Sequence, residues 1–252
     1  MTRKTVDILG IPVDAITMNE AVEKVGSFIE EGGTHAIYTP NAEIMMAAQR
    51  DSELRNILIN ADMLTADGMG VVLASKLLGC SVPEKVSGFD LIVEMFKTYG
   101  TKGLKCFFLG AKPGVADEAA KKVESDYPGV VVAGCQHGYF TTEEDDAIVR
   151  NINAANADLL LVALGAPQQE KWIYSHMDKL NAKVCAGVGG TIDILAGKIQ
   201  LAPDIFRRNG FEWLYRLCKE PRRAKRMLDL PRFILRVLLA RVTGGKKASK
   251  KS

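Results

Sequence analysis

The chain has 252 residues, of which 47% are hydrophobic and 25% charged, as in ordinary soluble globular proteins. It has no run of about 20 apolar residues that could span a membrane, and residues 1–14 lack the apolar core of a signal peptide. We therefore expect a cytoplasmic protein. The net charge of +3 hides an asymmetry, since residues 207–252 carry 15 Lys and Arg against 3 Asp and Glu, whereas the preceding residues are acidic.

Short apolar runs alternate with helix-length segments along most of the chain. The predicted strands are Val6–Leu9, Ala36–Thr39, Met63–Ala66, Cys106–Leu109, Val130–Ala133, Leu159–Leu164 and Val184–Val188. The predicted helices are Met18–Glu31, Ala42–Asn60, Met69–Leu78, Leu91–Tyr99, Val115–Ser125, Glu143–Ala154 and Gln168–Leu180. Most strands are apolar throughout, which favours a mainly parallel sheet buried on both faces. The pattern predicts an α/β, Rossmann-like fold with helices on both faces of the sheet.

A basic, helical region begins after about residue 200. Phe211–Cys218 has a helical pattern, and Pro221 favours the start of another helix. A basic amphipathic helix follows. Its apolar positions are Phe233, Ile234, Val237, Leu238 and Val242, and its arginines are Arg232, Arg236 and Arg241. We therefore divide the chain into an α/β core at residues 1–200, a helical appendage at 201–245 and a disordered basic tail at 246–252.

Glycine, proline and small polar residues follow most of the predicted strands. Ligands of parallel sheets bind at the carboxyl ends of the strands, so we expect a site formed by these loops. The loops are Thr39–Asn41, Asp67–Gly68, Gly110–Gly114, Gly165–Gln169 and Gly187–Gly190.

Asp67 is the best-placed carboxylate in these loops, because it follows a predicted strand and precedes Gly68 and a helix. In one interpretation its carboxylate caps that helix. In the other it is a general base that removes the proton of an attacking hydroxyl. Glu43 is the next candidate, and Asp193 can equally well be a surface residue near a helix terminus.

The segment Gly187–Gly190 lacks the G-x-G-x-x-G pattern of dinucleotide-binding proteins, and Arg207 stands where their acidic residue would be. The segment is either a tight strand–helix turn or a place where backbone amides bind a diphosphate. Gln168 and Gln169 begin a helix, either as a solvated first turn or as amides that bind a sugar or a nucleobase edge.

No His and Cys cluster has the spacing of zinc ligands, and no Asp-x-Asp pair follows a strand, so we expect neither a metal nor another cofactor. If the ligand of the site is a diphosphate that leaves in a reaction, its negative charge must then be neutralised by arginines. Their planar guanidinium groups bind phosphate in bidentate fashion. The basic end supplies Arg207, Arg208, Arg216, Arg222, Arg223 and Arg226.

The basic end itself has three interpretations, namely a solvated face, a segment that binds nucleic acid, or a surface that docks on an anionic membrane. We expect no nucleic acid as a partner, because no recognised motif accompanies the charge and the body is acidic. An in-plane helix with arginines on one side and apolar residues on the other favours the membrane surface.

Six segments carry a distinctive combination of motifs over most of the chain. They are Tyr38–Asp51, Ala61–Val72, Val86–Leu91, Gly165–Ile173, Gly187–Lys198 and Phe211–Arg223. In order and combination they resemble the WecG/TagA/CpsF family of glycosyltransferases. The resemblance implies an inverting, metal-independent transferase with a Rossmann-like core and a C-terminal appendage, peripheral on the inner face of the cell membrane. The implied donor is UDP-N-acetylmannosamine or its uronic acid, and the implied acceptor is N-acetylglucosamine diphospho-undecaprenol, for teichoic acid or a related surface polymer.

Matched by position, the resemblance implies a general base at Asp67 with Thr39 and Asn41 beside the reaction centre. The substrate-binding residues that it implies are Gln169, Gly187, Gly189, Gly190, Arg216, Arg223 and Arg226. One position departs from the family pattern, which usually reads E-R-V-x-G where this chain has Lys85. Lysine keeps the charge but lacks the bidentate fork, so we expect Lys85 to bind phosphate as a point charge.

Two other classes of function are compatible with the residues alone. A nucleotide-dependent oxidoreductase would share the Rossmann-like fold, although its glycine fingerprint is missing here. A non-catalytic protein of the membrane surface would explain the basic end but not the polar residues after the strands. Within the transferase class, the sequence leaves open the choice between N-acetylmannosamine, its uronic acid and another hexose, and it is compatible with a homo-oligomer.

Overall fold

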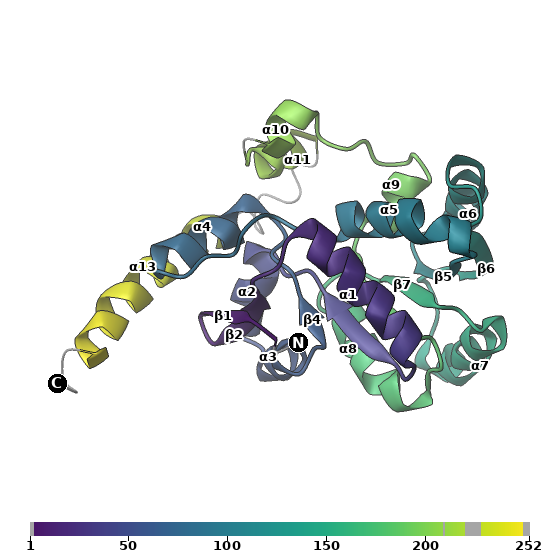
Figure 1. Ribbon diagram of the computed structural model, residues 1–252, viewed down its shortest axis with the longest axis horizontal. Coiled ribbons are helices and arrows are strands. Elements are labelled where there is room, and N and C mark those ends of the chain that lie inside the picture. Colours follow the sequence, from purple (N-terminus) through teal and green to yellow (C-terminus); the bar gives the residue numbers. More distant parts are fainter. Residues whose placement is uncertain (1–2, 209, 220–227, 249–252) are drawn as a thin grey trace.

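The centre of the computed structural model, which describes residues 3–208, 210–219 and 228–248, is a six-stranded sheet (Figure 1). The strands lie in the order β4-β3-β8-β7-β5-β6, and every neighbouring pair is parallel. Their bounds are β3 His35–Tyr38, β4 Met63–Leu64, β5 Lys105–Gly110, β6 Val131–Gln136, β7 Leu159–Ala163 and β8 Val184–Gly187. The α/β fold predicted from the sequence is confirmed, and the sheet is parallel throughout its described strands.

Alternate residues of the strands point into two hydrophobic cores, one on each face of the sheet. On β7, Leu160 and Val162 belong to the first core, whereas Leu159 and Leu161 belong to the second. The first core is covered by α2 (Ala42–Ala48), α3 (Ser52–Ile59), α4 (Met69–Leu77), α7 (Asp145–Ala155) and α8 (Gln168–His176). The second is covered by α1 (Met18–Glu31), α5 (Gly88–Tyr99), α6 (Val115–Asp126) and α9 (Thr191–Leu195). Burial on both faces explains why the strands are apolar throughout.

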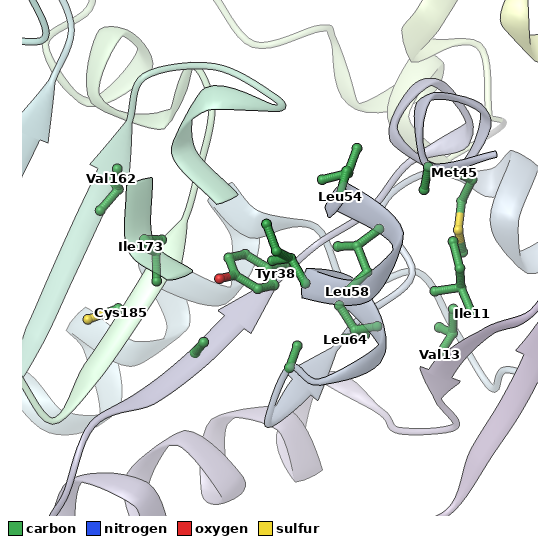
Figure 2. Packing of buried hydrophobic residues seen from close by; sticks show 14 of the residues in the cluster. Ile11, Val13, Tyr38, Met45, Leu54, Leu58, Leu64, Val162, Ile173 and Cys185 are labelled. Atoms are coloured by element: carbon green, nitrogen blue, oxygen red, sulfur yellow. The ribbon is translucent and has the colours of Figure 1, made fainter. Parts of the chain in front are cut away.

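The first core contains Tyr38, the last residue of β3, which is almost completely buried. Figure 2 shows its ring between Ile173 of α8 on one side and Leu54 and Leu58 of α3 on the other. This packing fixes the end of β3, and therefore fixes the position from which the next loop leaves the sheet.

The predicted helix Ala42–Asn60 is two helices in the structure. Asp51 separates α2 from α3, and its side chain accepts hydrogen bonds from the backbone N–H groups of Glu53 and Leu54, both at 3.0 Å. An aspartate with extended backbone at this position is a strong N-cap, so a new helix starts there although the apolar spacing continues.

The first predicted strand does not join the sheet. β1 (Thr5–Ile8) forms an antiparallel hairpin with β2 (Ile11–Asp14), a strand that the sequence analysis missed. Leu9 and Gly10 connect them, and both have positive φ, as the tight two-residue turn of a hairpin requires. The hairpin packs against α3 and α4, at the edge of the first core.

The C-terminal region forms the short helices α10 (Asp204–Arg208) and α11 (Glu212–Lys219), and the long helix α13 (Asp229–Ala248). The helix expected to start at Pro221 lies outside the described residues, as do residues 249–252. α13 continues past residue 246, where we expected disorder to begin.

α13 has two apolar stripes on opposite sides. It packs on α2 and α4 (Figure 1), where Phe233 and Val237 are completely buried. The opposite side exposes Leu235, Leu239 and Val242. The expectation that Phe233 and Val237 belong to an exposed apolar face is therefore wrong, because these two residues contact the protein core. None of the described helices is long and apolar enough to cross a bilayer.

Candidate functional site

Two cavities meet at the carboxyl ends of the strands. The polar cavity, of about 520 Å³, is lined by the loops that follow β3, β4, β7 and β8, and the apolar cavity, of about 470 Å³, lies between α4 and the C-terminal helices. Residues that line both are Asn41, Glu43, Asp67, Arg207 and Glu212. These shared residues form a border between the cavities. The strand-end loops singled out in the sequence thus come together, except Gly110–Gly114, which lines neither cavity.

Asp67 lies on this border. Its backbone N–H donates to the carbonyl of Pro40 at 3.2 Å, which ties the loop after β4 to the loop after β3. Gly68, with φ of 101°, is the N-cap residue of α4, and no side chain caps that helix. Asp67 therefore stands one residue before the N-cap position, which the capping interpretation had assigned to it. Asp67 instead lines both cavities, where a molecule bound in either of them would meet it.

Asn41 and Thr39 are held by the elements on either side of them. Asn41 is the N-cap of α2, and its side-chain oxygen accepts a hydrogen bond from the backbone N–H of Ile44 at 3.0 Å. Thr39 packs against Gly88, the first residue of α5, where a side chain would collide with the Thr39 hydroxyl. Both residues also line the polar cavity, so each is held in place by the fold and can contact a molecule bound in the cavity.

The glycine segment forms one wall of the polar cavity. Gly187 ends β8, Gly189 has φ of +53°, and Gly190 is the N-cap residue of α9. α9 has only five residues, so its helix dipole contributes little to anion binding. The Val188 and Gly189 N–H groups already donate to the Val162 carbonyl and to Gln169 Oε1, so the glycines serve a ligand mainly through the close approach that their missing side chains allow.

Gln168 and Gln169 differ, although they are neighbours. Gln168 is exposed, as the solvated interpretation requires. Gln169 is only 3% exposed and lines the polar cavity, so the solvated interpretation is wrong for it. Its side-chain oxygen accepts a hydrogen bond from the backbone N–H of Gly189 at 2.9 Å, which connects α8 to the glycine segment.

Glu170 is a buried acid to which the sequence analysis gave no role. It is 1% exposed, and its Oε1 accepts a hydrogen bond from Gln169 Nε2 at 2.9 Å. Burial raises the pKa of this carboxyl. The signal that could have found it is helical spacing, because Glu170 shares the buried side of α8 with Ile173.

Asp193 also lines the polar cavity, beyond the glycine segment. Burial raises the pKa of its carboxyl, against the opposing effect of Lys112. The interpretation of Asp193 as a surface residue near a helix terminus does not fit this half-buried position in the cavity wall.

Charged groups from the core pair with charged groups from the C-terminal region beside the border. Lys85 Nζ lies 3.4 Å from Glu212 Oε2 and 3.8 Å from Asp90 Oδ2. The guanidinium of Arg207 pairs with the same Asp90, which also accepts a hydrogen bond from Ser87 Oγ at 2.6 Å. Lys85, expected at a phosphate, is thus engaged by two carboxylates.

Of the arginines expected at a diphosphate, Arg223 and Arg226 lie outside the described residues. Arg216 belongs to α11, but its side chain is not among those that the structure describes. Arg207 contributes a described guanidinium to both cavities. The C-terminal region therefore does bring cationic charge to the site, through Arg207.

Comparisons with known proteins identify the family of the chain. The glycosyl transferase WecG/TagA/CpsF family matches residues 6–247. A protein of Bacillus spizizenii is 33% identical to this chain, and the match covers 84% of this chain and 82% of the relative. A protein of Bacillus subtilis is 32% identical, with 90% of this chain and 84% of the relative covered. A protein of Staphylococcus aureus is 33% identical, with 94% of this chain and 93% of the relative covered. Each is named N-acetylglucosaminyldiphosphoundecaprenol N-acetyl-beta-D-mannosaminyltransferase. A match over nearly the whole chain, with a carboxylate where two cavities meet, places this protein in the WecG/TagA/CpsF family of glycosyltransferases.

Proposed function

We propose that this protein transfers N-acetylmannosamine from UDP-N-acetylmannosamine to the N-acetylglucosamine of a diphospho-undecaprenol acceptor, with inversion and without a metal ion. The observation that carries the proposal is the position of Asp67 on the border between a polar and an apolar cavity. The names of the relatives support the acceptor and the sugar.

The two cavities suit two different substrates. The polar cavity offers the side-chain amide of Gln169 and the closely approachable backbone of Gly187–Gly190, which fit a nucleotide sugar. The apolar cavity is lined by Met69, Leu73 and Trp213, which fit the first isoprenoid units beside the acceptor's diphosphate. In this arrangement the two sugars meet at the shared border.

Asp67 acts as the general base in the proposed reaction. Its carboxylate takes the proton of the acceptor's 4-hydroxyl as that oxygen attacks the anomeric carbon from the face opposite UDP. The carbon–oxygen bond to UDP breaks, and the electron pair leaves with the diphosphate. Thr39, Asn41 and Gln169 position the sugars, which lowers the entropic part of the barrier.

Cations stabilise the negative charge that develops on the departing diphosphate. Lys85, which lines the apolar cavity, and Arg207, which lines both cavities, are described cations of the site, and we assign Arg216, Arg223 and Arg226 the same task. The ion pairs with Glu212 and Asp90 hold Lys85 and Arg207 in place until the diphosphate replaces a carboxylate. Folding of the C-terminal region onto the core thus completes the site.

The exposed side of α13 supports docking on an anionic membrane. Leu235, Leu238, Leu239 and Val242 are exposed, with Arg232 and Arg236 beside them on the helix. Apolar residues flanked by arginines are typical of helices that lie in the membrane interface. Docking there would bring the site to the level at which a lipid-linked acceptor resides.

The decisive experiment incubates the protein with a lipid-diphosphate N-acetylglucosamine acceptor and, separately, with the UDP forms of N-acetylmannosamine, its uronic acid and N-acetylglucosamine. Mass spectrometry of the product should show addition of N-acetylmannosamine only, with unchanged rate in EDTA. Asp67→Asn is the matched control. Transfer of another sugar would refute the proposed donor, and loss of activity in EDTA would refute metal independence.

Membrane docking has its own test. Sedimentation with vesicles that contain anionic lipid should bring down the wild-type chain, whereas Leu235→Ser/Leu239→Ser should remain in solution. Neutral vesicles should bind much less, because each cation near an anionic surface contributes about 1 kcal/mol. Equal binding of both chains would refute the assignment of the exposed side of α13 to the membrane.

A further inference from the structure

Three groups form a hydrogen-bonded chain behind the polar cavity, from Glu170 through Gln169 to Gly189. Glu170 Oε1 accepts from Gln169 Nε2, and Gln169 Oε1 accepts from the Gly189 backbone N–H, both at 2.9 Å. Gln169 and Gly189 line the cavity, whereas Glu170 lies behind them. The catalytic steps proposed above make no use of this buried acid.

The geometry fixes which way the amide of Gln169 points. A backbone N–H can only donate, so the atom of Gln169 that faces Gly189 must be the oxygen. The nitrogen must then face Glu170, whose carboxyl oxygen is an acceptor. With Glu170 replaced by an apolar residue, nothing would hold the nitrogen on that side, and the amide could rotate away from Gly189.

The burial of Glu170 is costly for the fold, which argues that it has another purpose. Its Oε2 is buried and has no hydrogen-bond partner among the described residues. A buried polar atom without a partner is unfavourable, and replacing such a group with an apolar one of similar shape can leave stability unchanged or increase it. An acid that served only packing would be poorly suited to this position.

We propose that Glu170 is a positioning residue, which orients the Gln169 amide so that its oxygen holds the glycine segment and its second N–H serves the donor sugar. This inference rests on the proposed transferase function, because it assigns the donor to the polar cavity. The amide nitrogen has two hydrogens, and Glu170 uses one of them. The other is available to a ligand in the cavity that Gln169 lines.

The test compares three variants with the wild-type chain. Glu170→Leu removes the acceptor, Glu170→Gln restores an acceptor oxygen, and Gln169→Ala removes the residue that is oriented. We expect Glu170→Leu to lower kcat/KM for the UDP-sugar by roughly ten- to a hundredfold, the usual effect of a small misplacement in a site. Its Tm should not fall, and Glu170→Gln should recover most of the activity.

A double-mutant cycle separates positioning from a general structural effect. If Glu170 acts through Gln169, Glu170→Leu should cause no further loss in a chain that already carries Gln169→Ala. If the loss of kcat/KM in the double variant equalled the product of the two single losses, the proposal would be overturned. A Tm several degrees lower in Glu170→Leu would assign the residue to the fold and would also overturn it.

A second measurement does not depend on activity. Hydrogen exchange of the Gly189 amide, followed by NMR, should be faster in Glu170→Leu than in the wild-type chain and slow again in Glu170→Gln. Unchanged exchange in Glu170→Leu would contradict the orienting role. If the wild-type chain transferred no sugar at all, the proposed function would fail, while the exchange rates would still decide whether Glu170 orients Gln169.

Discussion

The two walls of the site are held in different ways. The core wall consists of loops whose residues are fixed by neutral hydrogen bonds, such as Gly189 to Gln169 and Ile44 to Asn41. The C-terminal wall is attached through ion pairs, which are Arg207 with Asp90, Glu212 with Lys85 and Asp229 with Arg50. The first kind of contact is insensitive to salt, whereas the second weakens as ionic strength rises.

This difference separates the groups that must stay fixed during the reaction from the charged groups that must change partners. Groups that position sugars need to be fixed to within a fraction of an ångström, and buried hydrogen bonds provide that. Groups that neutralise a diphosphate have to change partners in each reaction, and ion pairs at the border can do so. The C-terminal wall stays attached to the core when its ion pairs exchange, because Phe233 and Val237 are buried against α2 and α4.

The largest effect should come from the core wall. Asp67→Asn should lower kcat by roughly 10²–10⁴, the usual contribution of a general base. Steady-state rates measured at saturating substrate check this, with a thermal melt to show that the fold is intact. Glu43→Gln is the matched control, since Glu43 lines the same two cavities. If the control lost as much activity as Asp67→Asn, Asp67 would not be the base.

The second effect concerns the apolar attachment of the C-terminal wall. Phe233→Ala should reduce the free energy of unfolding by about 3–5 kcal/mol, because the side chain is completely buried. Leu235→Ala, on the same helix but 59% exposed, should change it by no more than about 0.5 kcal/mol. Urea denaturation of both variants makes the comparison, and equal losses would mean that α13 does not pack on the core by its Phe233 side.

The third effect concerns the exchangeable charges. Arg207→Ala should lower kcat/KM for the UDP-sugar by roughly tenfold, because one charge-assisted contact to the diphosphate is lost. Arg241→Ala, an exposed arginine on α13 that lines neither cavity, should leave this value unchanged. The activity of the wild-type chain should also fall with added salt. Identical values for the two variants would remove Arg207 from the site.

The smallest effect should come from the Arg50–Asp229 pair, whose arginine is half exposed. Arg50 lowers the pKa of the Asp229 carboxyl below its usual range. A carboxyl with a lowered pKa in the folded state stabilises the fold above its unfolded pKa of about 3.9 and loses that contribution as pH falls through the folded value. Arg50→Ala should therefore cost about 1 kcal/mol or less at pH 7. The difference from the wild-type chain should shrink as the pH falls below about 3.9 and vanish once the pH lies below the lowered pKa of the folded state, and a constant difference would contradict the assignment.

Much of the fold could be predicted because it depends on local patterns. Continuous apolar runs such as Leu159–Leu164 indicate strands buried on both faces, and the parallel topology then gathers their following loops into one site. The positive φ of Leu9 could not be predicted, because leucine seldom adopts it. Asp51 could have been recognised as a cap, but the uninterrupted apolar spacing favoured one long helix.

The parts of the site that depend on distant contacts could not be predicted. Arg207 and Asp90 are far apart in the sequence, and no local pattern pairs them. The two apolar stripes of α13 are visible in the sequence, but which one contacts the core depends on the shape of α2 and α4. For the same reason, the sequence alone led us to assign Phe233 to a membrane.

A helix with one apolar side on the protein and the other facing outward acts as a spacer of fixed thickness. With a bilayer against Leu235 and Leu239, the surface of α2 and α4 would lie about one helix diameter, roughly 10 Å, from the lipid. An acceptor would then need to raise its sugar, its diphosphate and its first isoprenoid units over this distance, while the rest of its hydrocarbon chain stayed in the bilayer. The diameter of a single helix would thus set the distance between the lipid surface and the position at which the substrate is modified.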